Sequence, residues 1–288
     1  METLLFFLQS MVLGVVEGVT EFLPISSTGH LIVFEDLLGF QGSAQYVNTY
    51  SYVIQLGAIL AVVLLYRQKI LATLQAFLPR GGAGRPFRES GLGFWCMLAL
   101  ACLPGLACVL LVGDWVDAHF FCTRSVAVVL VLGGVGMLAA ERAWGRARTG
   151  APAGPWIALT PKQALCIGAF QCLSVVPGMS RSAATILGGW AAGLGTPAST
   201  EISFFLAIPV MVGMSGLKLL QIGGFGGMTA TELVGLAIGF AVSFLVALVV
   251  VRKFVAFLQR RGLAAFGIYR ILFGGLTLLL VSLGAVSG

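Results

Sequence analysis

Long runs of apolar residues dominate the chain and follow one another at short intervals. A helix needs about 20 apolar residues to cross the hydrocarbon core of a bilayer. Six segments reach that length and predict transmembrane helices, at roughly 46–66, 93–113, 124–141, 200–222, 231–251 and 264–284. The pattern therefore predicts an all-α polytopic membrane protein that forms a single integral-membrane domain over residues 1–288.

Two further apolar regions, 4–40 and 163–195, are each interrupted midway by a polar stretch that contains proline. Proline cannot continue the interior of a helix, so each region predicts two short helices rather than one long one. The halves of the second region, about 14 residues each, are too short for comfortable crossings. We therefore expect two broken-helix hairpins that re-enter the membrane, in addition to the six spans.

The basic residues indicate the orientation, because Lys and Arg concentrate on the cytoplasmic side of membrane proteins. This rule places 67–92, 142–162 and 252–263 inside and the connections 114–123 and 223–230 outside. The region 163–195 then leaves the inside and returns to it, as a re-entrant hairpin or two full crossings would, and its short halves favour the hairpin. The residues that carry this assignment are Arg67, Lys69, Arg80, Arg85, Arg88, Arg142, Arg146, Arg148, Lys162, Arg252, Lys253, Arg260 and Arg261.

Composition excludes three other classes of protein. The chain is 58% hydrophobic and only 10% charged, against roughly 25% charged in a soluble globular domain. The net charge of +6 could suit a nucleic acid, but most of the cations lie in short loops between apolar runs, so we expect no nucleic-acid partner. The six cysteines include no C-x-x-C pair and predict neither a disulfide framework nor a zinc site.

The two interrupted regions resemble each other. Residues 14–28 and 168–182 share the order glycine, acid or amide, hydroxyl, proline and hydroxyl cluster. Each is followed by three long predicted helices, and because three is odd, the second half enters the membrane upside down. We therefore expect an inverted-topology repeat, with one half at about 1–145 and the other at about 160–288, and a site where the broken helices meet.

Two carboxylates precede the first break. Glu17 and Glu21 are four residues apart, hence on one face of a helix, where like charges repel. In a setting of low dielectric constant, such a pair either shares a proton or binds a cation. Polar groups inside apolar segments are costly and mark functional sites, so a metal or acid–base role is favoured over a purely structural pair.

The first break also supplies Ser26, Ser27, Thr28 and His30. The hydroxyls can cap the helix that follows. Capping does not require a histidine, and the imidazole of His30 suits nucleophilic or acid–base work near neutral pH. The other histidine, His119, falls in a predicted outside connection, where we expect a structural role.

The second break contains Ser180, Arg181, Ser182 and Thr185. A guanidinium within an apolar hairpin requires an anionic partner, which could be a phosphate or one of the two glutamates. The start of the following helix adds unpaired backbone N–H groups and partial positive charge. The two breaks together therefore predict a metal-assisted phosphoryl-transfer site.

Other polar residues within apolar segments are assigned outside this site. Gln55, Gln171 and Glu201 are candidates to support the site residues or to pack between helices. Lys218 and Arg270 are expected to extend toward the membrane surface.

At these motifs the chain resembles the undecaprenyl-pyrophosphate phosphatase family, integral-membrane enzymes of bacteria also known as bacitracin-resistance proteins. The resemblance covers essentially the whole chain. Its motifs are residues 17–30, 53–61, 177–185 and 201–209. It implies hydrolysis of undecaprenyl pyrophosphate to undecaprenyl phosphate and phosphate, which recycles the lipid carrier of peptidoglycan synthesis and confers bacitracin resistance. It also implies an inner-membrane location, a site that opens to the periplasm, and dependence on Mg²⁺ or Ca²⁺.

Carried over to this chain, the resemblance implies that Glu17 and Glu21 hold the metal or handle protons and that Arg181 clamps the phosphate. Ser26, Thr28, Ser180, Ser182 and Thr185 are then expected to bind phosphate. Two assignments of the nucleophile stay open, namely Ser27 activated by His30 and direct attack by His30. The oligomeric state also stays open, with a homodimer as one expectation.

Two alternatives differ in class. Inverted repeats with broken helices also build transporters, so a lipid-phosphate transporter or flippase is the alternative function. The hydroxyl and histidine cluster beside paired carboxylates favours the hydrolase, since binding alone does not require it. The phosphatidic-acid-phosphatase superfamily requires a histidine downstream of its second arginine, and no histidine follows Arg181.

Overall fold

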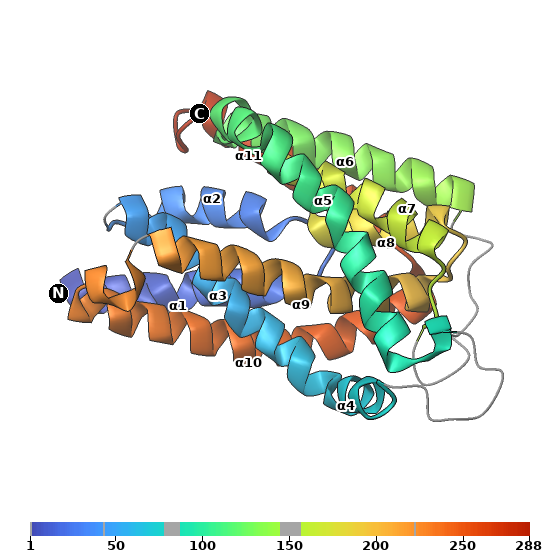
Figure 1. The fold of residues 1–288 in the computed structure, drawn as a ribbon. Coiled ribbons are helices and arrows are strands. Elements are labelled where there is room, and N and C mark those ends of the chain that lie inside the picture. Colours follow the sequence, from blue (N-terminus) through green and yellow to red (C-terminus); the bar gives the residue numbers. More distant parts are fainter. Residues whose placement is uncertain (1, 43, 78–86, 145–156, 222) are drawn as a thin grey trace.

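The computed structural model describes residues 2–42, 44–77, 87–144, 157–221 and 223–288, and within these residues every regular element is a helix (Figure 1). The α-helices are α1 (Glu2–Thr20), α2 (Ser27–Leu38), α3 (Ala44–Leu65), α4 (Arg67–Gln75), α5 (Gly91–Phe120), α6 (Thr123–Trp144), α7 (Pro161–Gln171), α8 (Arg181–Ala191), α9 (Thr196–Gln221), α10 (Ala230–Arg261) and α11 (Ala264–Ser282). Short 3-10 helices are η1 (Phe87–Glu89), η3 (Cys172–Val175) and η4 (Gly224–Gly227).

Six of the described helices are long and apolar enough to cross a membrane, which confirms the prediction of an all-α, multi-pass membrane protein with six spans. These helices are α1, α5, α6, α9, α10 and α11. One member differs from the prediction. Helix α3 bends by 67° into α4, and the two together form a broken span or a re-entrant loop, whereas α1 alone is long and apolar enough to cross. The interruption of region 4–40 begins only after Thr20, so the first arm of that hairpin is a full-length helix.

Two predicted connections prove to be largely helical. Helix α5 continues through Asp114 and Asp117 to Phe120, and α10 continues through the predicted loop 252–263 as far as Arg261. At 30 residues, α5 is about 45 Å long and so extends beyond a hydrocarbon core of about 30 Å. Charges placed that far along a helix can lie in water and need not end it. The predicted inside residues Arg80, Arg85, Arg146 and Arg148 lie outside the described residues.

The second interrupted region forms a short hairpin. Helices α7 and α8 have 11 residues each, so each is about 16 Å long and reaches only halfway through the core. The side-chain amide of Gln163, near the start of α7, donates to the Ala192 carbonyl at the end of α8, at 3.3 Å. In the first hairpin, the Gln9 amide likewise donates to the Leu38 carbonyl at 2.6 Å. In each hairpin the end of the second helix therefore lies beside the first helix, so the chain folds back on itself.

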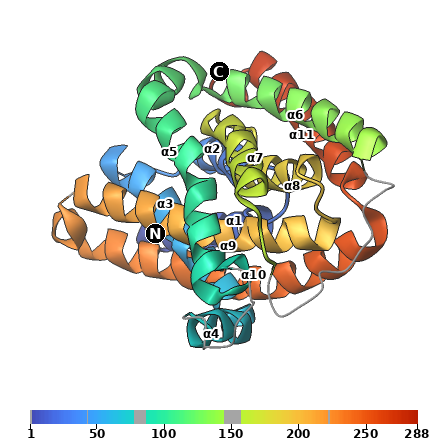
Figure 2. The same ribbon diagram turned by 45° about the vertical axis from the view of Figure 1, so that its right-hand side comes forward.

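The packing of the helices supports the predicted inverted repeat. Helix α1 lies along α10, and its counterpart α7 lies along α5, so each hairpin packs against a long helix of the other half (Figures 1 and 2). The remaining counterparts pair with each other, α6 with α11 and α3 with α9. If a two-fold axis relates the halves, each contact between them either has a symmetric copy, as α1–α10 has in α7–α5, or joins a helix to its own counterpart, as α6–α11 and α3–α9 do.

Small residues allow the helices around the first hairpin to approach closely. A side chain at Gly14 of α1 would place its Cβ only 2.6 Å from the carbonyl oxygen of Gly239 on α10. A side chain at Gly57 of α3 would likewise bring its Cβ against the carbonyl oxygen of Phe240 on α10. Such contacts are the usual means of helix association in membranes, where the hydrophobic effect between helices is absent.

One cation joins the two breaks. Arg270 of α11 is fully buried, at 0% exposure, and does not extend to the membrane surface as predicted. Its guanidinium donates to the carbonyls of Gly178 and Met179 in the second break at 2.9 and 2.8 Å, and to that of Pro24 in the first break at 3.4 Å. It therefore satisfies backbone oxygens that the breaks leave without helical partners, where no water can replace it.

Replacing Arg270 with methionine should strongly destabilise the protein, because several buried carbonyls lose their donor at once. We expect a loss of about 3 kcal/mol, seen as a fall of about 10 °C in the melting temperature of the detergent-solubilised protein. The matched control is Lys218→Met, which removes a half-buried cation near the ring of Tyr52 on α3. Equal melting temperatures for the two variants would contradict this role.

Candidate active site

The two breaks share an unusual backbone feature. Ser26 and Ser180, with φ of 70° and 71°, are the only residues other than glycine with positive φ among those that the structure describes. Each is the N-cap of the next helix, and its hydroxyl accepts from a backbone N–H, of Gly29 in α2 and of Ala183 in α8. Strained residues of this kind persist only where the surrounding structure holds them, and they gather at functional sites.

Direct contacts bring the two breaks together. The Ser182 hydroxyl of α8 donates to the carbonyl of Leu23 in the first break, at 2.9 Å. The Arg181 guanidinium forms an ion pair with Glu21, with 2.9 Å between Nη2 and Oε1. Residues some 160 positions apart in sequence thus meet at the starts of two short helices, as the sequence predicts.

The carboxylate of Glu21 is the centre of the site. While Oε1 accepts from Arg181, Oε2 accepts from the Ser27 hydroxyl at 2.5 Å. The side chains of Glu21, Ser27 and Arg181 are buried or nearly so, and water therefore weakens the ion pair and the hydrogen bond only a little. The structure therefore joins the candidate nucleophile Ser27 to a carboxylate and not to His30.

Arg181 is further anchored to α9. Its Nη1 donates to the carbonyl of Ser203 at 3.2 Å, and the hydroxyl of Thr185 donates to the Ser203 hydroxyl at 2.7 Å. The hydroxyls of Thr185 and Ser182 thus have partners within the protein, and they orient α8 and Arg181. Ser180 caps the helix, while Thr28 is half-buried at the start of α2.

His30 lies on α2, one turn after Ser27, and both of its ring nitrogens have partners. Nδ1 is 2.7 Å from the carbonyl oxygen of Ser26, and Nε2 is 2.8 Å from the hydroxyl of Tyr269. The imidazole also stacks on Phe273, with the ring centres 4.0 Å apart. His30 is therefore held beside the site by its own helix and by α11.

Glu17 provides an unsatisfied acceptor. It is 0% exposed, and neither carboxylate oxygen has a hydrogen-bond partner, although its charged neighbours include Glu21 and Arg181. Among the described residues, no group of three His, Cys, Asp or Glu side chains could hold a metal. Mg²⁺, however, is commonly bound by one or two carboxylates together with water and substrate phosphates. Glu17 and Glu21 fit that mode of binding.

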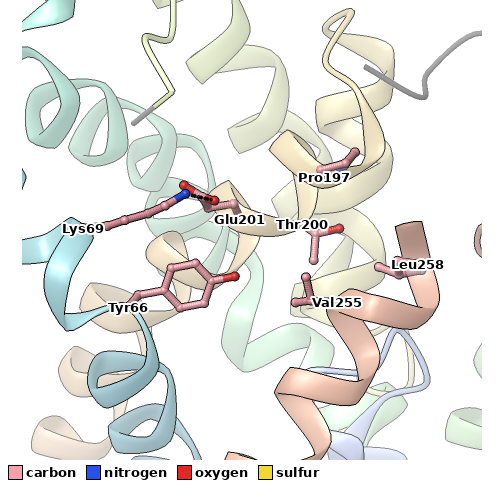
Figure 3. A pocket seen from close by; sticks show the side chains of 7 residues that line it. All are labelled: Tyr66, Lys69, Pro197, Thr200, Glu201, Val255 and Leu258. Atoms are coloured by element: carbon pink, nitrogen blue, oxygen red, sulfur yellow. Dashed lines mark hydrogen bonds and ion pairs between the residues drawn. The ribbon is translucent and has the colours of Figure 1, made fainter. Parts of the chain in front are cut away.

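The three candidate supporting residues lie elsewhere. Glu201 of α9 pairs with Lys69 of α4 at 2.5 Å, and both line a cavity of about 200 Å³ (Figure 3). Glu201 and Ser203 are two residues apart and so point from opposite sides of α9, which directs Glu201 away from Arg181. Gln171 faces Gly105 on α5, and its side-chain oxygen has no partner. Gln55 is half-buried on α3.

Sequence reasoning missed two residues of α11. Arg270 carried a signal, since a cation within an apolar run indicates function, but we expected its long side chain to extend toward the membrane surface. Tyr269 carried no signal, because a tyrosine in a membrane helix is ordinary. The remaining histidine, His119, lies on α5. Its ring stacks on that of Trp115, and its Nδ1 is 2.8 Å from the Trp115 carbonyl oxygen, so both contacts are within α5 and outside the two breaks.

Comparison with known proteins identifies the family of the chain. A family model described as bacitracin resistance protein BacA matches residues 10–276. An undecaprenyl-diphosphatase of Ruminiclostridium cellulolyticum is 52% identical over 280 residues, which cover 97% of this chain and 98% of the relative. Proteins of the same name from Clostridium tetani and Thermoanaerobacter pseudethanolicus are 44% and 41% identical, each over 96% of this chain and 97% of its own. The chain therefore belongs to the bacitracin resistance protein family.

Proposed function

We propose that this multi-pass membrane protein hydrolyses undecaprenyl diphosphate to undecaprenyl phosphate and inorganic phosphate. The observation that carries this is the arrangement at Glu21, where one carboxylate binds a serine hydroxyl and an arginine between two helix N-termini. The names of the relatives favour the same reaction over a transporter or flippase. The reaction returns the lipid carrier to peptidoglycan synthesis and confers resistance to bacitracin.

The substrate's two phosphates match two anion-binding features. Helices α2 and α8 begin at adjacent points, and a helix N-terminus presents unpaired N–H groups and partial positive charge. Arg181, the first residue of α8, adds a guanidinium that can bind phosphate oxygens in bidentate fashion. The polyprenyl tail would extend between the helices into the bilayer.

Ser27 is the nucleophile that this geometry favours. Its Oγ attacks the terminal phosphorus, the bond from that phosphorus to the bridging oxygen breaks, and undecaprenyl phosphate leaves. The hydroxyl proton passes to Glu21, which already accepts its hydrogen bond. Water then hydrolyses the phosphoserine and releases phosphate. Arg181 stabilises the negative charge that develops on the phosphoryl oxygens.

A divalent cation, Mg²⁺ or Ca²⁺, completes the proposal. Glu17 and Glu21 would hold it, since Glu17 offers two buried oxygens without partners. When bound, the cation neutralises charge on the diphosphate. The location proposed is the bacterial inner membrane, with the site open to the periplasm. The homodimer stays a prediction.

Ser27→Ala should abolish phosphate release from undecaprenyl diphosphate, by at least about 10³-fold, together with any acid-stable phosphoenzyme. The matched control is Ser51→Ala, because Ser51 also donates to a glutamate, Glu35, at 2.5 Å but outside the breaks. We expect the control to retain wild-type turnover. A phosphoenzyme that persists in Ser27→Ala and disappears in His30→Ala would make His30 the nucleophile.

Arg181→Lys should lower kcat by about 10²-fold, although the positive charge is kept, because a lysine cannot reproduce the bidentate geometry. Arg67→Lys is the control, since Arg67 is exposed and donates only to the Leu64 carbonyl. Steady-state assays of detergent-solubilised protein measure both variants. Activity of Arg181→Lys within a few-fold of wild type would exclude a phosphate clamp at this position.

Glu17→Gln should raise the Mg²⁺ or Ca²⁺ concentration needed for half-maximal activity by about tenfold or more, since an amide loses one anionic oxygen. The measurement is a metal titration of phosphate release after treatment with EDTA. Glu89→Gln, which changes an exposed glutamate, should leave the titration unchanged. An identical titration curve for Glu17→Gln and wild type would contradict a metal-binding role.

A further inference from the structure

The environment of His30 defines which nitrogen carries its hydrogen. The side chain is 2% exposed, and Nδ1 lies 2.7 Å from the carbonyl oxygen of Ser26. A carbonyl oxygen only accepts, so Nδ1 must carry a hydrogen. Burial disfavours a positive charge on the imidazole, and the buried cation of Arg270, the next residue after Tyr269, adds to this effect. His30 is therefore the neutral Nδ1–H tautomer, with a lone pair on Nε2.

That lone pair has a specific partner on α11. The hydroxyl of Tyr269 is 2.8 Å from Nε2, and since Nε2 is the acceptor, the tyrosine donates. The imidazole is thus connected to α2 at one nitrogen and to α11 at the other. With both nitrogens engaged, His30 cannot take the proton of Ser27 in this arrangement, which agrees with the Ser27–Glu21 hydrogen bond.

Two further contacts make the tyrosine a rigid support. Phe273, one turn after Tyr269 on α11, stacks on the imidazole at 4.0 Å with the ring planes 5° apart. Tyr269 and Phe273 are parallel to each other within 5°. Arg270 fixes α11 at this level through the carbonyls of both breaks. The Tyr269 hydroxyl is therefore held at a defined point relative to the two helix N-termini.

We propose that Tyr269 is a positioning residue for the break site: its hydroxyl directs the Nε2 lone pair of His30, while the Ser26 carbonyl selects the tautomer. The proposal rests on the proposed function, since it assigns the support of a site histidine. Tyr269 itself is 41% exposed. A buried histidine is thus linked through one hydrogen bond to a side chain at the edge of the molecule.

The test uses the fact that the chain has only two histidines. In a His119→Gln background, a protein labelled with ¹⁵N-histidine reports the ring nitrogens of His30 alone. We expect a protonated Nδ1 and a hydrogen-bonded Nε2. Tyr269→Phe should move the Nε2 resonance to that of a nitrogen without a donor. Tyr50→Phe, which removes a buried hydroxyl bonded to the Ser10 carbonyl, should leave it in place.

Turnover is measured on the same proteins with undecaprenyl diphosphate and Mg²⁺. His30 in turn holds the carbonyl of Ser26, the residue before Ser27, so loss of the hydrogen bond that orients His30 should lower kcat by about ten- to a hundredfold. KM should stay within about twofold, because Tyr269 does not contact the proposed phosphate groups. Phe replaces the ring of Tyr269 without loss of packing, and equal melting temperatures verify that the variant folds.

Each outcome decides between the two proposals. An unchanged Nε2 resonance in Tyr269→Phe overturns the positioning role, and so does a shifted resonance with unchanged kcat. A wild-type protein that releases no phosphate under any metal condition overturns the proposed function instead. In that case the resonance still shows whether Tyr269 orients His30, so the two failures are distinguishable.

Discussion

A helix that stops inside a bilayer exposes backbone groups that have no water to bind, and this constraint shapes the centre of the molecule. Each break frees carbonyl oxygens at the end of one helix and N–H groups at the start of the next. Arg270 supplies donors for the carbonyls of both breaks from a single guanidinium. The hydroxyls of Ser26 and Ser180 accept from the N–H groups of Gly29 and Ala183, in the first turns of α2 and α8. The two helix starts meet at the place where we propose that an anion binds.

A symmetric scaffold carries an asymmetric site. Ser27 and Arg181 occupy the same place in the two halves, directly after the strained serine, yet one is the proposed nucleophile and the other a cation. Glu17 and Gln171 are a second such pair, and each has a buried oxygen without a partner. Gln171, however, faces Gly105 of α5, outside the contacts of the site. Divergence of the repeat has therefore placed the carboxylates in one half and the cation in the other, as transfer of a charged group requires.

Much of this was accessible from the sequence, because local pattern and membrane physics act together. Length and hydropathy predict spans well, since the bilayer sets a minimum length for each. The side chains at the breaks were identified because polar groups in apolar segments are rare and costly. Helix ends at 120 and 261 were not, because charged residues in water do not stop a helix. The Ser27–Glu21 and His30–Tyr269 hydrogen bonds depend on side-chain direction, and the latter joins residues more than 200 positions apart.

The shared carboxylate of Glu21 has a consequence for the order of events. In the structure without substrate, Arg181 and Ser27 draw on the two oxygens of the same group. A phosphate that recruits the guanidinium must take it from Glu21, which leaves that carboxylate with less compensating positive charge and more affinity for the serine proton. Arrival of the anion would thus itself prime the nucleophile, while the ion pair with Arg181 would keep Glu21 a weak base until then.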